Sequence, residues 1–129
     1  MRGAIRHAER AKQLNDFTGL QYGNITPTDI DGVIDYKDRA MVFLEIKFSG
    51  APLPFGQRLA LERLVKNNEK AGKRSIAIVA DHDITDTSRQ VPAAKCIVRE
   101  YYVAPNTKWL IPRAPMTVRE MIDMFLDLV

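Results

Sequence analysis

The chain has 129 residues, a length typical of one domain and too short for two independent hydrophobic cores. Hydrophobic residues make up 46% of it and charged residues 27%, a composition that excludes global disorder. The 19 Lys and Arg residues exceed the 16 Asp and Glu residues, and the resulting net charge of +3 favours a polyanionic partner only mildly. We therefore expect residues 1–129 to form a single domain.

The cysteine content and the first residues bear on where the protein resides. Cys96 is the only cysteine, which excludes an intramolecular disulfide bond and a zinc site built from cysteines. Residues 1–10 carry several charges and no apolar signal segment, and no stretch approaches the roughly 18 apolar residues of a membrane-spanning helix. These features predict a cytoplasmic protein that does not enter a membrane.

The start of the chain predicts a helix and then a weak strand. Apolar residues recur every three positions over residues 3–16, which is the pattern of a helix with one buried stripe. Glu9 lies beside that stripe rather than opposite it. Residues 20–25, bracketed by two glycines, could form a short strand.

A β-hairpin is predicted next. Residues 29–36 alternate as a strand that places Asp29 and Asp31 on the same face, and residues 40–48 form a second, more apolar strand. The polar residues 37–39 between them make a tight turn, so we expect the two strands to pair antiparallel.

The second half of the chain predicts two helices and two strands. The expected elements are a helix over residues 55–72 with Gly72 as its C-terminal cap, a strand over 75–80, a polar loop over 81–95, a strand over 96–103, and a last helix that begins at the capping box Thr117-Val-Arg-Glu120. A helix between two strands predicts a parallel crossover connection. We therefore expect an α/β fold with a mixed central sheet flanked by helices.

Two ionisable residues share one face near the end of the apolar strand. In Glu45-Ile46-Lys47, alternation points Glu45 and Lys47 to the same side. The hairpin can bring the carboxylate of Asp31 beside Glu45, close enough for both to share one Mg²⁺ or Mn²⁺ ion. Such an ion can neutralise a phosphate and make water nucleophilic, with Lys47 as a cation beside the reacting group. The pattern therefore predicts a site for the hydrolysis of phosphodiester bonds.

These residues, in this order, resemble the PD-(D/E)XK nucleases. The similarity covers about residues 3–80 and rests on Glu9 of the first helix, Thr28-Asp29-Ile30-Asp31-Gly32, Phe43-Leu44-Glu45-Ile46-Lys47 and Phe55-Gly56-Gln57-Arg58. In branches that include Holliday-junction resolvases and small virus-type replication-repair nucleases, an acidic residue of the first helix joins the site and a Gln of the later helix approaches it. The aspartate motif departs from the family pattern, since it reads Thr-Asp-Ile-Asp-Gly instead of Pro-Asp.

The resemblance implies a restriction-endonuclease-like core and a metal-dependent deoxyribonuclease, acting as a structure-selective or nonspecific endonuclease in a bacterial cell or a virus-infected host. It implies Asp31 and Glu45 as ligands of Mg²⁺ or Mn²⁺ and Lys47 as the catalytic cation. Glu9, as a further metal ligand, and Gln57 would support them. We expect Gln57 to point toward Lys47, because it lies one helical turn before the buried side of its helix.

Other interpretations of these residues stay open. Asp29 is an alternative to Asp31 as the metal ligand. Asp31, Glu45 and Lys47 could instead form cross-strand ion pairs on an exposed face of the sheet, and Asp81-His82-Asp83 could bind a metal or stabilise a turn. The alternative function is a catalytically silent nucleic-acid-binding or assembly module.

Two surfaces could contact partners. The basic residues that could contact DNA phosphates are Arg58, Arg63, Lys66, Lys70, Lys73 and Arg74. The last helix carries Met121, Met124 and Phe125, which could form a homodimer surface or pack on the chain's own sheet. DNA is therefore the expected partner, and a homodimer is a possible assembly.

Overall fold

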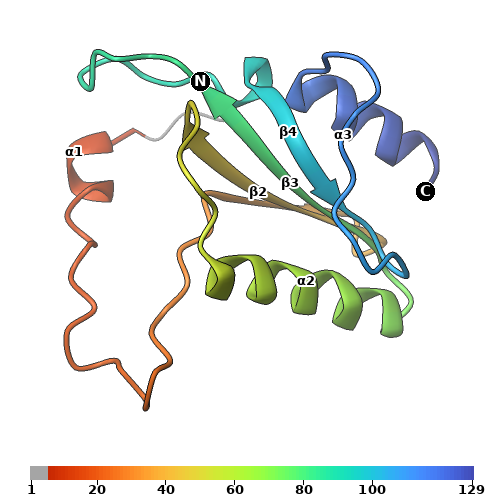
Figure 1. Cartoon of the computed structure of the whole chain (residues 1–129), viewed down its shortest axis with the longest axis horizontal. Helices are drawn as coiled ribbons and strands as arrows, with labels where there is room; N and C mark the ends of the chain where they lie inside the picture. Colours follow the sequence, from red (N-terminus) through yellow and green to blue (C-terminus); the bar gives the residue numbers. More distant parts are fainter. Residues whose placement is uncertain (1–5) are drawn as a thin grey trace.

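A four-stranded mixed sheet forms the centre of the molecule (Figure 1). The structure is a computed structural model that describes residues 6–129. The strands lie side by side in sequence order: β1 Gly32–Tyr36, β2 Ala40–Phe48, β3 Arg74–His82 and β4 Ile97–Tyr102. The described residues also form the helices α1 Ala8–Ala11, α2 Phe55–Lys70 and α3 Val118–Asp127. None of these helices is both long enough and apolar enough to span a membrane. The chain is therefore an α/β protein, as the sequence predicts.

The connections between the strands set their directions. β1 and β2 pair antiparallel through a turn in which Lys37 and Asp38 have φ values of 56° and 59°, the backbone twist that tight hairpins favour. α2 connects β2 to β3, which run parallel, and β3 pairs antiparallel with β4. The last residues of β2 and β3 consequently lie at the same edge of the sheet.

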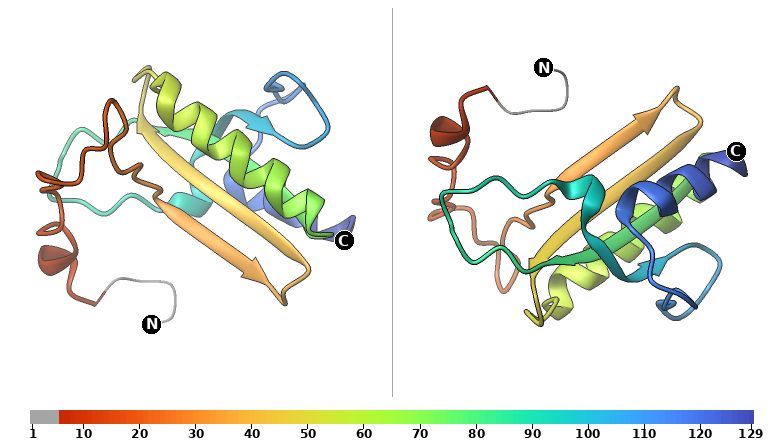
Figure 2. Two further views of the ribbon diagram at one scale, coloured as in Figure 1. Left: turned by 90° about the horizontal axis from the view of Figure 1, so that it is seen from below. Right: turned by 90° about the horizontal axis from the view of Figure 1, so that it is seen from above.

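α3 covers one face of the sheet with an apolar core (Figure 2). Alternate residues of the strands point to this face, and Val42, Ile78 and Val98 are buried there. They pack in one cluster with Val118 and Phe125 of α3. This face is therefore apolar along the whole helix.

The capping box predicted at the start of the last helix is present. The side chain of Thr117 accepts a hydrogen bond from the backbone N–H of Glu120, and the side chain of Glu120 accepts one from the backbone N–H of Thr117. α3 begins at the next residue, Val118. The predicted start of this helix is therefore confirmed. It could be predicted from the sequence because a capping box depends only on neighbouring residues.

α2 covers the opposite face, and its apolar core fills only part of that face (Figure 2). Phe43 of β2 packs there in one cluster with Leu61 and Val65 of α2. Further along β2, alternation places Glu45 and Lys47 on this same face. One end of the α2 face is therefore polar.

Most of the later elements match their predicted bounds closely. β2 spans the predicted residues, and α2 ends two residues before Gly72, whose φ of +86° suits the position after a helix. β3 is longer than predicted at both ends, and β4 is one residue shorter at each end. The predicted loop between them contains a short 3₁₀ helix, η1 Ala93–Lys95.

The helix predicted over residues 3–16 is wrong in its length. Residues 3–5 lie outside the described residues, and the remainder contains only the single helical turn α1. Leu14 of the expected apolar stripe is 76% exposed. Such a stripe needs an apolar surface to cover, and α2 and α3 already occupy the two faces of the sheet (Figure 2).

Two further predictions for the first part of the chain are corrected. Residues 20–25 form a turn in which Tyr22 and Ile25 pair with each other, and they add no strand to the sheet. β1 begins at Gly32, three residues later than the alternating pattern indicates.

Candidate functional site

Glu45 and Lys47 form the polar end of β2 on the face that α2 covers. Glu45 is buried, with only 4% of its surface exposed. Its Oε1 lies 3.4 Å from Nζ of Lys47, whose side chain is 20% exposed. The carboxylate is thus enclosed while the lysine head reaches toward the surface.

Asp31 lies beside β2 just beyond the end of β1. Its backbone N–H donates to the carbonyl of Leu44 at 3.1 Å, which extends the pairing of the two strands by one residue and brings Asp31 next to Glu45. Its Oδ2 accepts a hydrogen bond of 2.6 Å from the backbone N–H of Ile46. A carboxylate acceptor makes this bond stronger than an ordinary backbone bond. The structure therefore brings Asp31, Glu45 and Lys47 together, as the hairpin predicts.

Burial and repulsion act together on Glu45. Burial first, and then the nearby Asp31 carboxylate, raise the pKa of Glu45 to about 7, although Lys47 opposes both. Glu45 Oε2 is buried and has no hydrogen-bond partner. A cation beside this oxygen would supply the missing contact and relieve the repulsion between the carboxylates.

The donor set suits a hard divalent cation. Asp31 and Glu45 offer carboxylate oxygens, the ligands that Mg²⁺ and Mn²⁺ prefer. Mg²⁺ commonly binds through one or two carboxylates and completes its coordination with water and substrate phosphate. The two residues present fit such an ion, and Lys47 adds a positive charge next to it.

Gln57 lies in the first turn of α2 and holds the segment that precedes Asp31. Its Nε2 donates to the backbone carbonyl of Asp29 at 2.8 Å, while its Oε1 is buried without a partner. The hydrogen bond that the Gln57 side chain makes joins it to the segment before Asp31, and the expected direction toward Lys47 stays a prediction. Asp31 is the aspartate whose carboxylate is fixed on β2, whereas Asp29 is held through its backbone.

The structure does not bring Glu9 to these residues. Glu9 is exposed on α1, and α1 stands apart from the sheet in all the ribbon views (Figures 1 and 2). Among residues 6–129 no group of three or more His, Cys, Asp and Glu side chains is placed to hold a metal ion. The role of a third metal ligand predicted for Glu9 therefore gains no support from its position.

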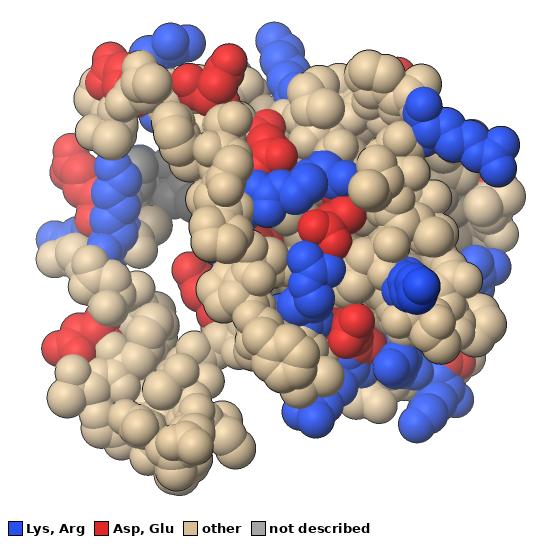
Figure 3. Space-filling view, viewed as in Figure 1, with Lys and Arg blue, Asp and Glu red and all other residues tan. Residues whose placement is uncertain are grey.

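Two ion pairs that the sequence did not reveal extend the polar part of the α2 face. Asp81, which pairs in register with Lys47, accepts a hydrogen bond of 3.0 Å from Nε of Arg99. Glu100 accepts two hydrogen bonds from Arg58, at 2.6 and 3.1 Å. Figure 3 shows acidic and basic side chains alternating across the middle of the molecule. Charges of opposite sign thus neutralise one another beside the candidate site.

The triplet Asp81-His82-Asp83 does not gather around a common point as metal ligands would. Asp81 is engaged by Arg99, and Nδ1 of His82 accepts a hydrogen bond of 3.1 Å from the backbone N–H of Ile84. Asp83 is exposed. These contacts favour the alternative interpretation, in which the triplet stabilises the chain after β3.

Part of the predicted basic surface is engaged within the molecule. Arg58 is paired with Glu100, Lys73 with Asp38, and Arg74 with Glu69 at 3.3 Å. The remaining basic residues of the group are Arg63, Lys66 and Lys70. Their side chains leave a smaller positive surface on α2 than the sequence suggests.

The last helix packs mainly on its own sheet. Met121 and Phe125 are 7% and 5% exposed and belong to the α3 core, whereas Met124 is 58% exposed. Two of the three residues predicted as a dimer surface are thus buried within the chain. A homodimer stays a prediction.

Comparisons with known proteins yield no relative of this chain. It matches no protein-family model, no curated protein and no solved structure. The functional interpretation therefore depends on the residues and their geometry.

Proposed function

We propose that this chain is a metal-dependent DNA endonuclease that hydrolyses phosphodiester bonds. The observation that carries the proposal is the convergence of Asp31, Glu45 and Lys47 at one end of β2, with Glu45 buried and one of its oxygens unpartnered. A surface ion-pair cluster gains little from a buried carboxylate whose pKa is raised to about 7. A site that binds a cation explains both features.

The order of the elements supports a restriction-endonuclease-like core. A hairpin, β1 and β2, is followed by α2 and then by the parallel strand β3, which is the arrangement that the resemblance to PD-(D/E)XK nucleases implies. The candidate residues lie at the carboxyl end of β2, where open α/β sheets commonly hold their ligands. Fold and site thus agree with the same proposal.

Each residue of the site has a distinct task in the proposed reaction. Asp31 and Glu45 would hold Mg²⁺ or Mn²⁺, which when bound supplies positive charge to the phosphate and lowers the pKa of the attacking water. Lys47 reaches from the same face to orient that water or to stabilise the charge that develops on the phosphate. Gln57 positions the segment before Asp31 through its bond to Asp29.

The proposed substrate is DNA recognised by its structure rather than by a long sequence. The chain covers little DNA, and sequence-specific recognition usually buries about 1,000 Å² or more of protein surface. Structure-selective or nonspecific cutting suits a domain of 129 residues better.

The direct test is incubation of the purified protein with linear, flapped and four-way-junction DNA. Cleavage is expected with Mg²⁺ or Mn²⁺ and should stop when a chelator removes the ion. Binding of these DNAs without cleavage under any divalent ion would instead favour the silent nucleic-acid-binding module.

A pair of matched variants tests the assignment of the ligand. Asp31→Asn keeps an oxygen that can accept the bond from Ile46 but loses the negative charge, whereas Asp29→Asn makes the same change on an exposed side chain two residues away. Cleavage should fall more than about a hundredfold in Asp31→Asn, since even residues that only support metal ligands are typically worth ten- to a hundredfold. Near-normal cleavage by Asp31→Asn together with loss in Asp29→Asn would transfer the role to Asp29.

A further inference from the structure

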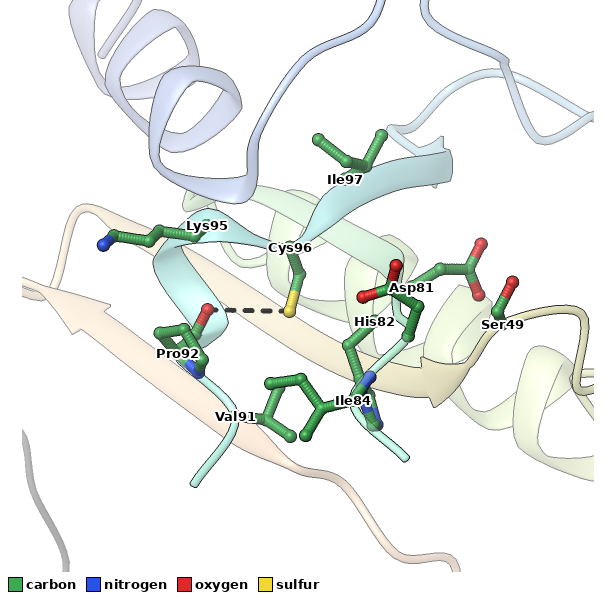
Figure 4. A pocket seen from close by; sticks show the side chains of 10 residues that line it. Ser49, Asp81, His82, Ile84, Val91, Pro92, Lys95, Cys96 and Ile97 are labelled. Atoms are coloured by element: carbon green, nitrogen blue, oxygen red, sulfur yellow. Dashed lines mark hydrogen bonds between the residues drawn. The ribbon is translucent and has the colours of Figure 1, made fainter. Parts of the chain in front are cut away.

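A cavity of about 350 Å³ lies at the end of β3, outside the proposed metal site (Figure 4). We call it the end pocket. The lining residues used below are Ser49, His82, Ile84, Val91, Pro92 and Cys96. Its volume is within the range of about 300–1,000 Å³ that small-molecule sites occupy.

The end pocket opens next to the candidate active site. Lys47 pairs in register with Asp81, and the backbone N–H of Ser49 donates to the carbonyl of His82 at 2.8 Å. Neighbouring strands are about 4.8 Å apart, so the cavity begins roughly one strand spacing from the strand that carries Lys47. The pocket and Lys47 thus share one end of the sheet but lie on its two faces, since Cys96 and Val91 pack with the α3 core while Lys47 points to the α2 face. A base of a DNA strand whose phosphate lies at Lys47 would reach the pocket by crossing this end of β2 and β3.

Part of the pocket wall is aliphatic, formed by Ile84, Val91 and Ile97, and the charged residues Asp81, Asp83 and Lys95 also line the pocket. Figure 4 shows the sulfur of Cys96 pointing toward the side chains of Val91 and Ile84. Burial raises the pKa of the Cys96 thiol, and its Sγ lies 3.6 Å from the carbonyl of Pro92. The thiol therefore stays protonated and acts as wall rather than as a nucleophile.

Polar groups stand at the edge of these walls. Nδ1 of His82 accepts the hydrogen bond from Ile84, which in the neutral ring leaves Nε2–H as a donor. The imidazole packs edge-on against Phe48, with ring centroids 5.5 Å apart, and so has a fixed orientation. The hydroxyl of Ser49 adds a second polar group. Apolar walls with polar groups along one side match a nucleobase, which has apolar faces and polar edges.

We infer that the end pocket is a subsite for an unstacked nucleobase of the DNA strand that is held at Asp31, Glu45 and Lys47. The inference rests on the proposed function and narrows its substrate class. A base reaches the pocket only when it leaves the helical stack, which is easier at flaps, junctions and mismatches than in an intact duplex. The pocket thereby provides a physical reason for structure-selective cutting.

The test uses flapped DNAs that carry the fluorescent base 2-aminopurine at successive positions across the branch point. The full-length protein and its Lys47→Ala variant, which keeps the DNA uncut, are added to each DNA. Fluorescence should rise at one position, because the base leaves its stacked neighbours and enters an aliphatic cavity. An unchanged signal at every position would overturn the inference.

A variant that fills the cavity provides the matched comparison. Val91→Phe places a ring inside the end pocket, and Ile111→Phe adds the same ring at a position that is 77% exposed and lines a different cavity. Val91→Phe should abolish the fluorescence rise and weaken DNA binding roughly tenfold, within the range for loss of one stacked base, while Ile111→Phe should do neither. Should Val91→Phe fail to fold, Ile84→Trp fills the cavity from the neighbouring wall.

The outcomes separate this inference from the nuclease proposal. If the protein cleaves DNA with Mg²⁺ but Val91→Phe shows the same 2-aminopurine fluorescence and DNA affinity as the protein with Val91, the base subsite is overturned. The nuclease proposal is then unaffected. A fluorescence rise that Val91→Phe removes, without cleavage of any DNA, supports the pocket and overturns the nuclease.

Discussion

The two faces of the sheet bury side chains of different kinds, apolar ones beneath α3 and both apolar and charged ones beneath α2. On the α3 face, strand residues such as Val42, Ile78 and Val98 meet a helix with an apolar side. On the α2 face the apolar cluster gives way to Glu45, Lys47 and a row of ion pairs. Both faces consist of alternate residues of the same strands, so the difference lies in the choice of side chains and not in the backbone.

The comparison indicates that the α3 face contributes mainly to stability, while the α2 face holds the residues of the proposed site. The buried apolar area on the α3 face favours folding, whereas a buried and partly unpartnered carboxylate opposes it. A buried carboxylate with a raised pKa is therefore a candidate for a functional role. Changes on the two faces should therefore affect different measurements.

The largest effect is expected from Lys47→Ala. In the proposed reaction Lys47 acts mainly in the transition state, so cleavage should fall by roughly a thousandfold or more, with DNA binding and the melting temperature nearly unchanged. Glu45→Ala should abolish metal binding as well as cleavage. Lys108→Ala, at an exposed loop position outside the basic group named above, is the control. Single-turnover kinetics with bound DNA measure the difference, and wild-type rates in Lys47→Ala would lead us to adopt the binding-module alternative.

Phe125→Ala tests the α3 face, where a substitution should change stability and not cleavage. Phe125 is buried in the core, and its truncation should lower the free energy of unfolding by about 3–5 kcal/mol. Met124→Ala, on the adjacent exposed position, should change it by less than about 0.5 kcal/mol. Chemical denaturation measures both. The rate of cleavage per folded molecule should stay the same. Slower cleavage by fully folded Phe125→Ala would mean that the α3 face also contributes to cleavage.

Glu45→Gln should make the metal-free protein more stable at mildly alkaline pH. The folded-state pKa of about 7 exceeds the ordinary value of 4.5, so the contribution of Glu45 to stability is fully present below pH 4.5 and is lost as pH rises through 7. Because Glu45→Gln removes the ionisable group, it should raise the free energy of unfolding at this pH by on the order of 1–2 kcal/mol.

Mg²⁺ provides the complementary measurement. It should raise the melting temperature of the wild type and leave Glu45→Gln nearly unaffected, because only an ionised Glu45 gains from the cation. Glu9→Gln on the exposed α1 is the control and should behave as the wild type. An equal response of all three proteins to Mg²⁺ would remove Glu45 from the metal site.

The smallest effect is expected from Thr117→Ala. It removes the hydroxyl that accepts a hydrogen bond from the N–H of Glu120 at the start of α3, and it should cost about 1 kcal/mol of stability. Ser88→Ala, an exposed loop position where a hydroxyl also makes a local hydrogen bond, serves for comparison. Thermal unfolding measures the stability of both variants, and cleavage should not change in either of them.

The sequence was most informative where neighbouring residues determine the structure. The bounds of β2 follow from a continuous run of β-forming residues, and the start of α3 follows from a capping box within four residues. The placement of Glu45 and Lys47 on one face follows from alternation alone. The core of the candidate site was therefore predictable.

Contacts between distant residues could not be predicted in the same way. The pairs Asp81 with Arg99 and Arg58 with Glu100 depend on strand order and on where α2 docks. The first helix failed for a related reason, since its periodicity indicates a stripe but not whether a sheet face is free to receive it. Glu9 was assigned to the site through that helix.

The bond from the Ile46 N–H to Asp31 bears on how the protein would choose its ion. One oxygen of Asp31 is already occupied by the backbone, and the unpartnered oxygen of Glu45 is the other main donor, so the chain offers few ligand atoms. Ca²⁺ requires six to eight oxygens, whereas Mg²⁺ retains several waters and accepts phosphate oxygens. Such a sparse site should hold its ion weakly alone and more firmly with DNA present. Ion and nucleic acid would then bind cooperatively, each raising the affinity for the other.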